Sequence, residues 1–196
     1  MGKYSGIIWT MIDVEIIQKL KDGKVGVMPT DTIYGLVGLA LNPKAVERIY
    51  KLRKRDLQKP MIILIGDVAD LETFNIEIDN KTRAIFKKYW PGKVSIILPC
   101  EDQKFSYLHR GEKSLAFRLP GNRDLRGLIK KVGPLVAPSA NIEGKKPAET
   151  IEEAKKYFSD KVDFYIDGGT IKTRPSTLIK IDNGQVRMLR EGSVRI

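Results

Sequence analysis

Hydroxyl, carboxylate and amide side chains follow two predicted strands, at the point where a proline ends each strand. Residues 29–36 (PTDTIYGL) set two threonines around an aspartate directly after an apolar run. Residues 137–141 (APSAN) place a serine and an asparagine two positions apart after a second apolar run. The loops that follow sheet strands are where α/β folds bind ligands. Both segments could contact a bound molecule, and a helix cap or a self-bonded loop would explain them as well.

A basic turn at residues 51–60 (KLRKRDLQKP) could hold phosphate, because it carries five cations in ten residues. Helix C-termini favour cations, so a solvated basic turn is the alternative interpretation. An apolar strand follows at once, however, and it would hold Arg53, Arg55 and Lys59 at a sheet edge. Guanidinium forks match phosphate oxygens, and a triphosphate needs several such groups.

Arg118 lies inside an apolar strand, residues 115–119 (LAFRL). A buried arginine is costly unless it meets an anion, which makes this residue a candidate ligand contact. Two further segments, 174–178 (RPSTL) and 189–192 (LREG), also combine cations with small polar residues. Each of these is weak alone, since a basic surface would account for it.

The chain contains a single cysteine, Cys100, and a single histidine, His109. An intrachain disulfide and a zinc site built from Cys and His are therefore excluded. Cys100 follows an apolar run and is predicted to be a buried or strand-end thiol rather than a nucleophile. His109 lies in a loop-like stretch, and a catalytic role for it stays open. The GxGxxG, GxxxxGK[ST] and GxSxG signatures are missing, so covalent nucleophilic catalysis has little support.

The composition is that of an ordinary globular domain, with 42% hydrophobic and 30% charged residues in 196. We expect a single domain over residues 1–196. The net charge of +11 suggests a polyanionic ligand, either nucleotide or nucleic acid. No run of 18 apolar residues and no export signal is found, which predicts a cytoplasmic protein without a membrane span.

Strands and helices alternate along the chain. A capping box at residues 10–13 and the Asn42-Pro43 pair predict two helix starts. An Asn183-Gly184 turn predicts a hairpin. The pattern predicts helices over 12–23, 43–54, 82–90, 124–132 and 151–158, and strands over 24–28, 37–41, 61–65, 94–98, 114–119, 135–137, 162–166, 177–181 and 185–189. This organisation favours one α/β domain around a mixed, twisted sheet.

Six motifs in a fixed order, PTDTIYGL, R-x-R-x-x-x-K-P, AFRLP, APSAN, PSTLI and LREG, lie within residues 13–192. In this the chain resembles the YrdC-like threonylcarbamoyl-AMP synthase family (TsaC type). The resemblance implies a twisted, mixed to mostly parallel sheet with flanking helices and a concave, basic cleft. It also implies that the accessory C-terminal domain of longer relatives is absent, because the sequence stops soon after LREG.

The resemblance implies an enzyme that joins L-threonine, bicarbonate and ATP into threonylcarbamoyl-AMP and releases pyrophosphate. A partner enzyme would then transfer the threonylcarbamoyl group to an adenosine beside the tRNA anticodon. ATP would be a substrate, Mg²⁺ would travel with it, and no metal site of the protein itself is expected. Direct contact with tRNA stays open. The rival interpretation is an RNA-binding module, for tRNA or double-stranded RNA, without turnover.

Matched motif by motif, the resemblance implies three groups of site residues: catalytic, Arg53 and Arg55; threonine-binding, Thr32, Arg118, Ser139, Ser176 and Thr177; ATP-binding, Arg55, Lys59, Ser114, Asn141, Thr150 and Arg190.

Two departures from the family pattern concern the basic turn and the strand after it. Counted back from Pro60, the usual lysine of the family falls on Arg53, and Lys51 lies two residues earlier. Either Arg53 replaces that lysine or the register slides to Lys51. Leu64 also stands where many relatives carry histidine.

Overall fold

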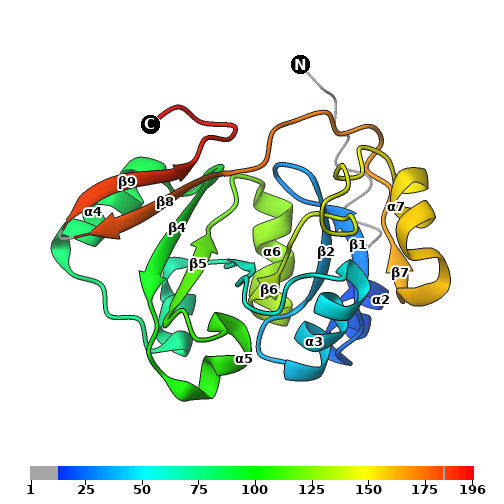
Figure 1. Ribbon diagram of the computed structural model, residues 1–196, viewed down its shortest axis with the longest axis horizontal. Coiled ribbons are helices and arrows are strands. Elements are labelled where there is room, and N and C mark those ends of the chain that lie inside the picture. Colours follow the sequence, from blue (N-terminus) through cyan, green and yellow to red (C-terminus); the bar gives the residue numbers. More distant parts are fainter. Residues whose placement is uncertain (1–12, 183) are drawn as a thin grey trace.

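The computed structural model describes residues 13–182 and 184–196. Within them, nine strands form one sheet in the order β7-β1-β2-β6-β3-β5-β4-β8-β9 (Figure 1). The strands are β1 (Gly26–Pro29), β2 (Tyr34–Leu39), β3 (Ile62–Leu64), β4 (Val94–Pro99), β5 (Ser114–Arg118), β6 (Leu135–Val136), β7 (Phe164–Tyr165), β8 (Thr177–Asp182) and β9 (Gln185–Arg190). The α-helices are α2 (Asp13–Lys21), α3 (Pro43–Arg53), α4 (Asn80–Tyr89), α5 (Ser106–His109), α6 (Arg123–Val132) and α7 (Ile151–Phe158).

The sheet is mixed, as predicted, but the expectation of a mostly parallel sheet is wrong. Among the described strands, the parallel pairs are β1 with β7, β3 with β5 and β4 with β8. The other five pairs are antiparallel. Connection length explains two of the five antiparallel pairs, β1 with β2 and β8 with β9, because parallel neighbours need a crossover of about a dozen residues or more. The loop from β1 to β2 is too short for a crossover and returns the chain antiparallel.

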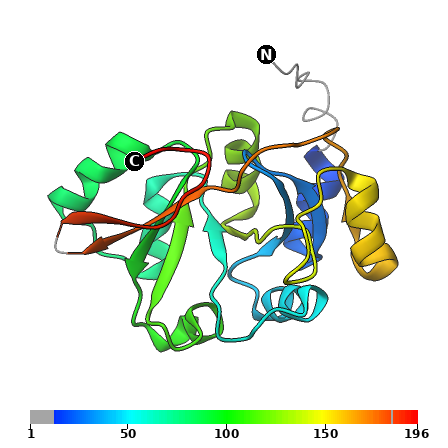
Figure 2. The same ribbon diagram turned by 45° about the horizontal axis from the view of Figure 1, so that its top comes forward.

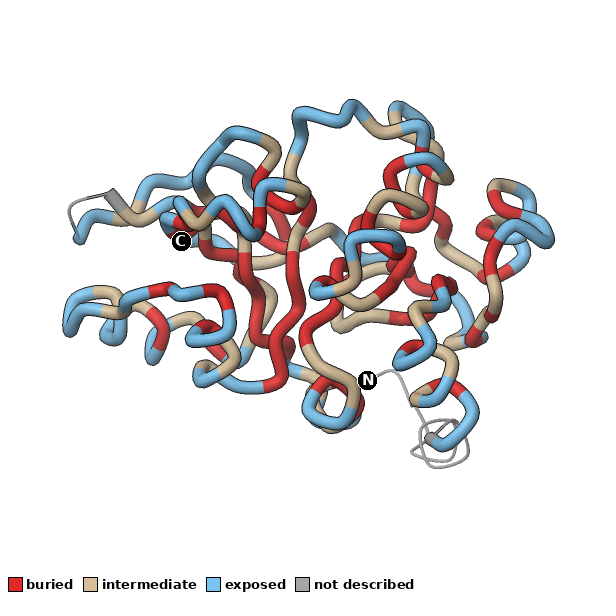
Figure 3. Tube along the Cα trace, turned by 90° about the horizontal axis from the view of Figure 1, so that it is seen from below, coloured by how far each residue is buried: buried red, intermediate tan, exposed pale blue. Residues whose placement is uncertain are grey.

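Helices cover both faces of the sheet, and the strands alternate between two cores. Helices α3, α4, α5 and α7 contribute to the larger core, and α2 and α6 to the smaller one. In β2, Leu36 lies in the larger core and Val37 in the smaller one; in β6, Val136 and Leu135 divide in the same way. This is the period of two that a strand imposes on its side chains. Figure 3 shows the central strands as buried.

Helix α3 begins and ends as the sequence predicts, and it carries the basic turn. Asn42 caps it by accepting a hydrogen bond from the amide of Ala45, with Pro43 at the first position. At the other end Lys54 adopts a left-handed conformation (φ 48°), and its amide bonds the carbonyls of Lys51 and Tyr50. This turn fixes where the residues after the helix lie.

The predicted elements are found, with boundaries shifted by a few residues. The prediction of a loop around His109 is wrong, because His109 ends α5 and is buried. A 3-10 helix over Val68–Phe74 was also missed. The predicted capping box at residues 10–13 and turn at 183–184 lie partly outside the described residues. Strands β8 and β9 pair antiparallel, which confirms the hairpin's strands.

The β8–β9 hairpin and α7 lie at opposite ends of the molecule, with the remaining strands between them (Figure 2). In the described ranges, no helix has the length and apolar character needed to cross a bilayer.

Candidate active site

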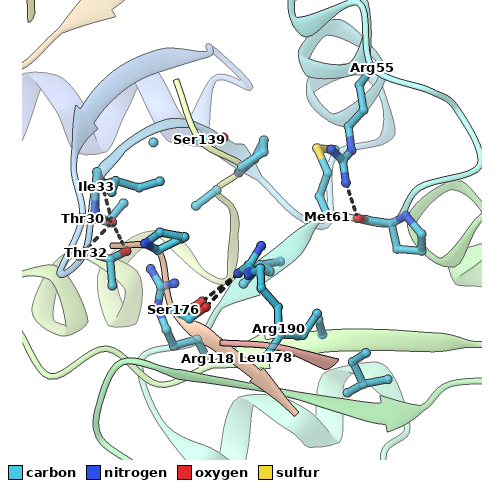
Figure 4. A pocket seen from close by; sticks show the side chains of 18 of the residues that line it. Thr30, Thr32, Ile33, Arg55, Met61, Arg118, Ser139, Ser176, Leu178 and Arg190 are labelled. Atoms are coloured by element: carbon cyan, nitrogen blue, oxygen red, sulfur yellow. Dashed lines mark hydrogen bonds between the residues drawn. The ribbon is translucent and has the colours of Figure 1, made fainter. Parts of the chain in front are cut away.

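A cavity of about 320 Å³ lies where the loops after β1 and β6, the end of α3, and strands β5, β8 and β9 meet (Figure 4). It is lined by Thr30, Thr32, Ile33, Gly35, Arg53, Arg55, Pro60, Met61, Ile62, Ile97, Glu112, Ser114, Ala116, Arg118, Ala137, Pro138, Ser139, Pro175, Ser176, Leu178 and Arg190. In Figure 4 the two threonines and Arg55 lie on opposite sides, with Arg118 and Arg190 below Ser139. Segments far apart in sequence thus converge on one site.

Strand alternation decides which side chains of β5 and β8 reach the cavity. Ser114 and Arg118 line it, whereas the intervening Phe117 packs in the larger core. On the β8 side, Ser176 lines the cavity and Thr177 does not. The buried Thr177 hydroxyl donates to the carbonyl of Val194 (2.6 Å). It also accepts from the amide of Gly192 (3.1 Å). The structure therefore does not bring Thr177 to the predicted threonine site.

The loop after β1 presents two hydroxyls in a fixed arrangement. Thr30 Oγ1 donates to the carbonyl of Ile33 (2.7 Å) and lies 3.2 Å from Thr32 Oγ1. Thr32 is 2% exposed, and its carbonyl accepts a hydrogen bond from Thr173. Both threonines line the cavity, and Thr30 was not among the predicted site residues.

Arg53 is the best-anchored cation of the site. It is 4% exposed; Nε donates to the carbonyl of Asn141, and Nη2 donates to Ser139 Oγ and to Asn141 Oδ1, each at 3.1 Å. Burial, with Arg55 nearby, lowers the pKa of Arg53 to about 10, and Glu143 partly offsets this. Arg53 therefore remains a cation at pH 7. Lys51 is exposed and lies outside this cavity, so of the two candidates for the family lysine, Arg53 is the one at the site.

The turn after α3 directs the side chains of Arg55 and Lys59 to different places. Arg55 is half-buried and lines the cavity, and its guanidinium donates to the carbonyls of Lys59 (3.0 Å) and Pro60 (2.9 Å). The Lys59 side chain is 58% exposed and its ammonium pairs with Glu143 (3.0 Å). The structure thus places Arg55 at the cavity and leaves Lys59 outside its lining.

The anion that Arg118 requires is Asp31. Arg118 Nη2 lies 2.9 Å from Asp31 Oδ1, and the two side chains are 4% and 5% exposed. Burial lowers the pKa of Arg118, and the charge of Asp31 opposes that shift. The sequence shows that Arg118 needs a partner but does not identify Asp31, because the two residues lie 87 positions apart (118 − 31).

Arg190 completes the cationic lining from the end of β9. Its Nη2 donates to the carbonyl of Ser176 (2.9 Å), and Ser176 Oγ in turn hydrogen-bonds with Ser95 Oγ (2.8 Å). Partial burial, followed by the charges of Arg118 and Arg55, lowers the pKa of Arg190. Cations close enough to disfavour each other's charge make a site that an anion would stabilise.

Asn141 and Thr150 have structural partners of their own. Asn141 is buried, and its amide donates to the carbonyls of Ile142 (2.8 Å) and Lys145 (2.7 Å) while its oxygen accepts from Arg53. Thr150 caps α7 through a hydrogen bond from the amide of Glu153 (3.3 Å). Neither residue lines the cavity, although both were predicted to contact ATP.

Of the predicted site residues, the cavity gathers Thr32, Arg53, Arg55, Ser114, Arg118, Ser139, Ser176 and Arg190. The residues discussed for other roles lie elsewhere. Cys100 is buried, as predicted, and burial raises the pKa of its thiol. His109 is also buried, and Leu64 packs in the smaller core.

Four arginines and one glutamate, Glu112, are the ionisable residues among those lining the cavity. Together with the serine and threonine hydroxyls they can hold a ligand that carries several negative charges and a small polar group. Among the described residues, no group of three or more His, Cys, Asp or Glu side chains is placed to hold a metal ion.

Residues 18–192 match the Sua5/YciO/YrdC family, which is described as "Telomere recombination". The match covers most of the sequence, and the chain therefore belongs to this family. The resemblance inferred from the six motifs is thereby confirmed.

Individual relatives agree with this assignment. A Methanocaldococcus jannaschii protein is 33% identical over 93% of this chain and 87% of its own. The threonylcarbamoyl-AMP synthase of Bacillus subtilis is 33% identical over 76% of this chain and 44% of its own. The structure of Pyrococcus abyssi Sua5 complexed with L-threonine has a TM-score of 0.83 at 30% identity, covering 94% of this chain and 54% of that chain. This chain thus spans about half the length of the latter two proteins.

Proposed function

We propose that the chain is an L-threonylcarbamoyladenylate synthase, a nucleotidyltransferase that joins L-threonine, bicarbonate and ATP and releases pyrophosphate. One observation carries the proposal: eight of the residues matched to the family's motifs line a single cavity. The names of the relatives support it, since the B. subtilis protein is called a threonylcarbamoyl-AMP synthase and the P. abyssi protein was solved with L-threonine.

The proposed reaction needs no nucleophile from the protein. The threonine amine attacks CO2, formed from bicarbonate, and gives a carbamate. A carbamate oxygen then attacks the α-phosphate of ATP, and pyrophosphate leaves with the electrons of the broken P–O bond. Catalysis then consists of alignment and charge neutralisation, which fixed cations and hydroxyls supply.

The residues that line the cavity would have two roles. Arg53, Arg55 and Arg190 would stabilise the phosphates, with Arg53 fixed by its three hydrogen bonds. Thr32, which lies across the cavity from Arg55, would contact the threonine, and Arg118, beside Arg190, would bind its carboxylate (Figure 4). Mg²⁺ would enter with the ATP phosphates and neutralise part of their charge.

The same proposal places the chain in the modification of tRNA in the cytoplasm. The mixed anhydride of a carbamate and AMP is an activated carbonyl donor, so an enzyme that transfers carbamoyl groups must consume it. The acceptor that we propose is the adenosine next to the tRNA anticodon.

The test is pyrophosphate release by the purified chain, measured with complete substrates and with threonine or bicarbonate left out. We expect release, and formation of a threonine-linked AMP, only in the complete mixture. Equal pyrophosphate release without threonine would indicate a different nucleotide enzyme. RNA binding that weakens steeply with salt, without turnover, would favour the rival RNA-binding module.

A further inference from the structure

Arg118 is held at the cavity by a single buried counterion, and this pair is incomplete. The ion pair with Asp31 joins Nη2 to Oδ1 at 2.9 Å. In the part of the chain that the structure describes, Arg118 Nε has no hydrogen-bond acceptor, and Asp31 Oδ1 has no aligned donor. A guanidinium offers five donors, so the pair neutralises the charge of Arg118 without satisfying its hydrogen bonds. Unsatisfied donors of a buried cation on a cavity wall leave room for a second anion.

Asp31 approaches Arg118 from outside the cavity. Arg118 lines the cavity and Asp31 does not, although its neighbours Thr30 and Thr32 do. Asp31 Oδ2 accepts a hydrogen bond from the amide of Gly121 (3.2 Å), just beyond β5. The carboxylate thus ties the loop after β1 to the end of the strand that carries Arg118. A ligand can reach Arg118 from the cavity without displacing Asp31.

The other cations of the cavity make this counterion necessary. The charges of Arg118 and Arg55 contribute to the lowered pKa of Arg190, so these guanidinium groups repel one another. Without Asp31, Arg118 would be a buried cation among like charges. A buried charge without a partner either turns its side chain toward solvent or destabilises the fold. An arginine that had turned away could no longer present its fork to a carboxylate.

We propose that Asp31 is a positioning residue: it holds the guanidinium of Arg118 at the cavity wall and so sets the affinity of the site for the carboxylate of its amino-acid substrate. This inference rests on the proposed function, because it takes the substrate to be an amino acid. It adds to that function a residue that does not touch the ligand.

The experiment compares three proteins by equilibrium binding: the wild type, Asp31→Asn, and Asp163→Asn as a matched control. Asp163 also pairs with an arginine, Arg48, and also accepts from a backbone amide, that of Val25 (2.8 Å), but it lies outside the cavity. The probes are L-threonine, L-threoninamide, which lacks the anionic carboxylate, and ATP. Thermal unfolding of each protein is measured in parallel.

We expect Asp31→Asn to raise the Kd of L-threonine by about 10- to 100-fold. This is the effect of losing one charge-assisted hydrogen bond between Arg118 and the substrate carboxylate. The Kd of L-threoninamide and of ATP should change less than about threefold, and Asp163→Asn should change none of them. Wild-type affinity in Asp31→Asn would overturn the inference. Tighter threonine binding would also overturn it, because it would show that Asp31 competes with the ligand. Equal losses of affinity for threonine and for ATP would overturn it as well.

Two further outcomes keep the test decisive. If Asp31→Asn does not fold, Asp31→Glu is measured in the same way. It keeps the charge and moves it by one methylene, so an unchanged threonine Kd would overturn the inference. A wild type that does not bind L-threonine would refute the proposed function itself, whereas wild-type binding with an unaffected Asp31 variant refutes the positioning role alone.

Discussion

Arg53 and Asn141 meet at two points: Nε of Arg53 donates to the Asn141 carbonyl and Nη2 donates to the Asn141 side-chain oxygen, both at 3.1 Å. The two residues come from the end of α3 and from the loop after β6. Because Asn141 does not line the cavity, we expect it to act on a ligand through Arg53. A supporting role for Asn141 and the direct ATP contact that its motif implies therefore make different predictions.

Arg53→Ala should lower kcat/KM for pyrophosphate release by about 10- to 100-fold, because a charge-assisted hydrogen bond contributes roughly 1.5–3 kcal/mol. Asn141→Ala should cost less, and the double variant should resemble Arg53→Ala alone, because both substitutions act on one guanidinium. Steady-state kinetics of the three variants measure this coupling. Strictly additive losses would mean that Asn141 acts on the ligand independently of Arg53.

Lys51→Ala should leave kcat/KM within about twofold of wild type, since exposed substitutions away from a site have small effects. Lys51 is exposed, and Arg53, two residues later, lies in the cavity. The same kinetic assay compares Lys51→Ala with Arg53→Ala. A crippled Lys51 variant beside an active Arg53 variant would move the catalytic cation to Lys51.

Much of this arrangement was predictable from the sequence, and what was not depends on long-range contacts. Helix α3 has its cap, proline and apolar stripe in sequence, so its end and the arginines after it could be placed. The pairing of Arg118 with Asp31 could not be predicted from the sequence, because it depends on how β5 meets the loop after β1.

The positions of the predicted site residues that do not line the cavity have equally physical explanations. Thr177 is the first residue of β8, and a strand sends adjacent side chains to opposite faces, so Leu178 lines the cavity and Thr177 does not. The exposure of Lys59 follows from the geometry of the turn, which residue spacing alone does not define. The 3-10 helix over Val68–Phe74 was missed because so short an element shows no clear apolar period.

Gly192→Ala should lower the free energy of unfolding by about 1–3 kcal/mol, as overpacking typically does. A Cβ at this position would lie 2.4–2.5 Å from backbone atoms of Pro175, Ser176 and Thr177, which cannot move aside as a side chain can. Urea unfolding measures the loss. Gly127→Ala is the control: a Cβ there, within α6, meets nothing within 4 Å. This alanine should raise stability by about 0.5–1 kcal/mol. Equal effects of the two substitutions on stability would contradict the close approach of residues 175–177 to the Gly192 backbone.

Asp163→Asn should remove part of the acid sensitivity of folding. Burial raises the pKa of Asp163, but the Val25 amide and Arg48 outweigh burial and leave the pKa lowered. A carboxyl whose pKa is lower in the folded state stabilises above its unfolded pKa of about 3.9 and loses that contribution as pH falls. Unfolding free energies from pH 7 down to pH 3 should therefore decline less in the variant than in the wild type. If the unfolding free energies of variant and wild type fall in parallel with pH, this ion pair does not contribute to the acid sensitivity of folding.

Thr150→Ala distinguishes a helix cap from an ATP contact, the role that the family motif implies. Thr150 accepts a hydrogen bond from the Glu153 amide and does not line the cavity, so we expect a loss of about 1 kcal/mol in unfolding free energy and an unchanged KM for ATP. Asp79→Ala is the matched control, because Asp79 caps α4 through the Thr82 amide (2.7 Å) and also lies outside the cavity. Both variants should lose stability and keep the KM for ATP. A KM that rises in Thr150→Ala alone would restore Thr150 to the ATP site and require the start of α7 to close on the bound nucleotide.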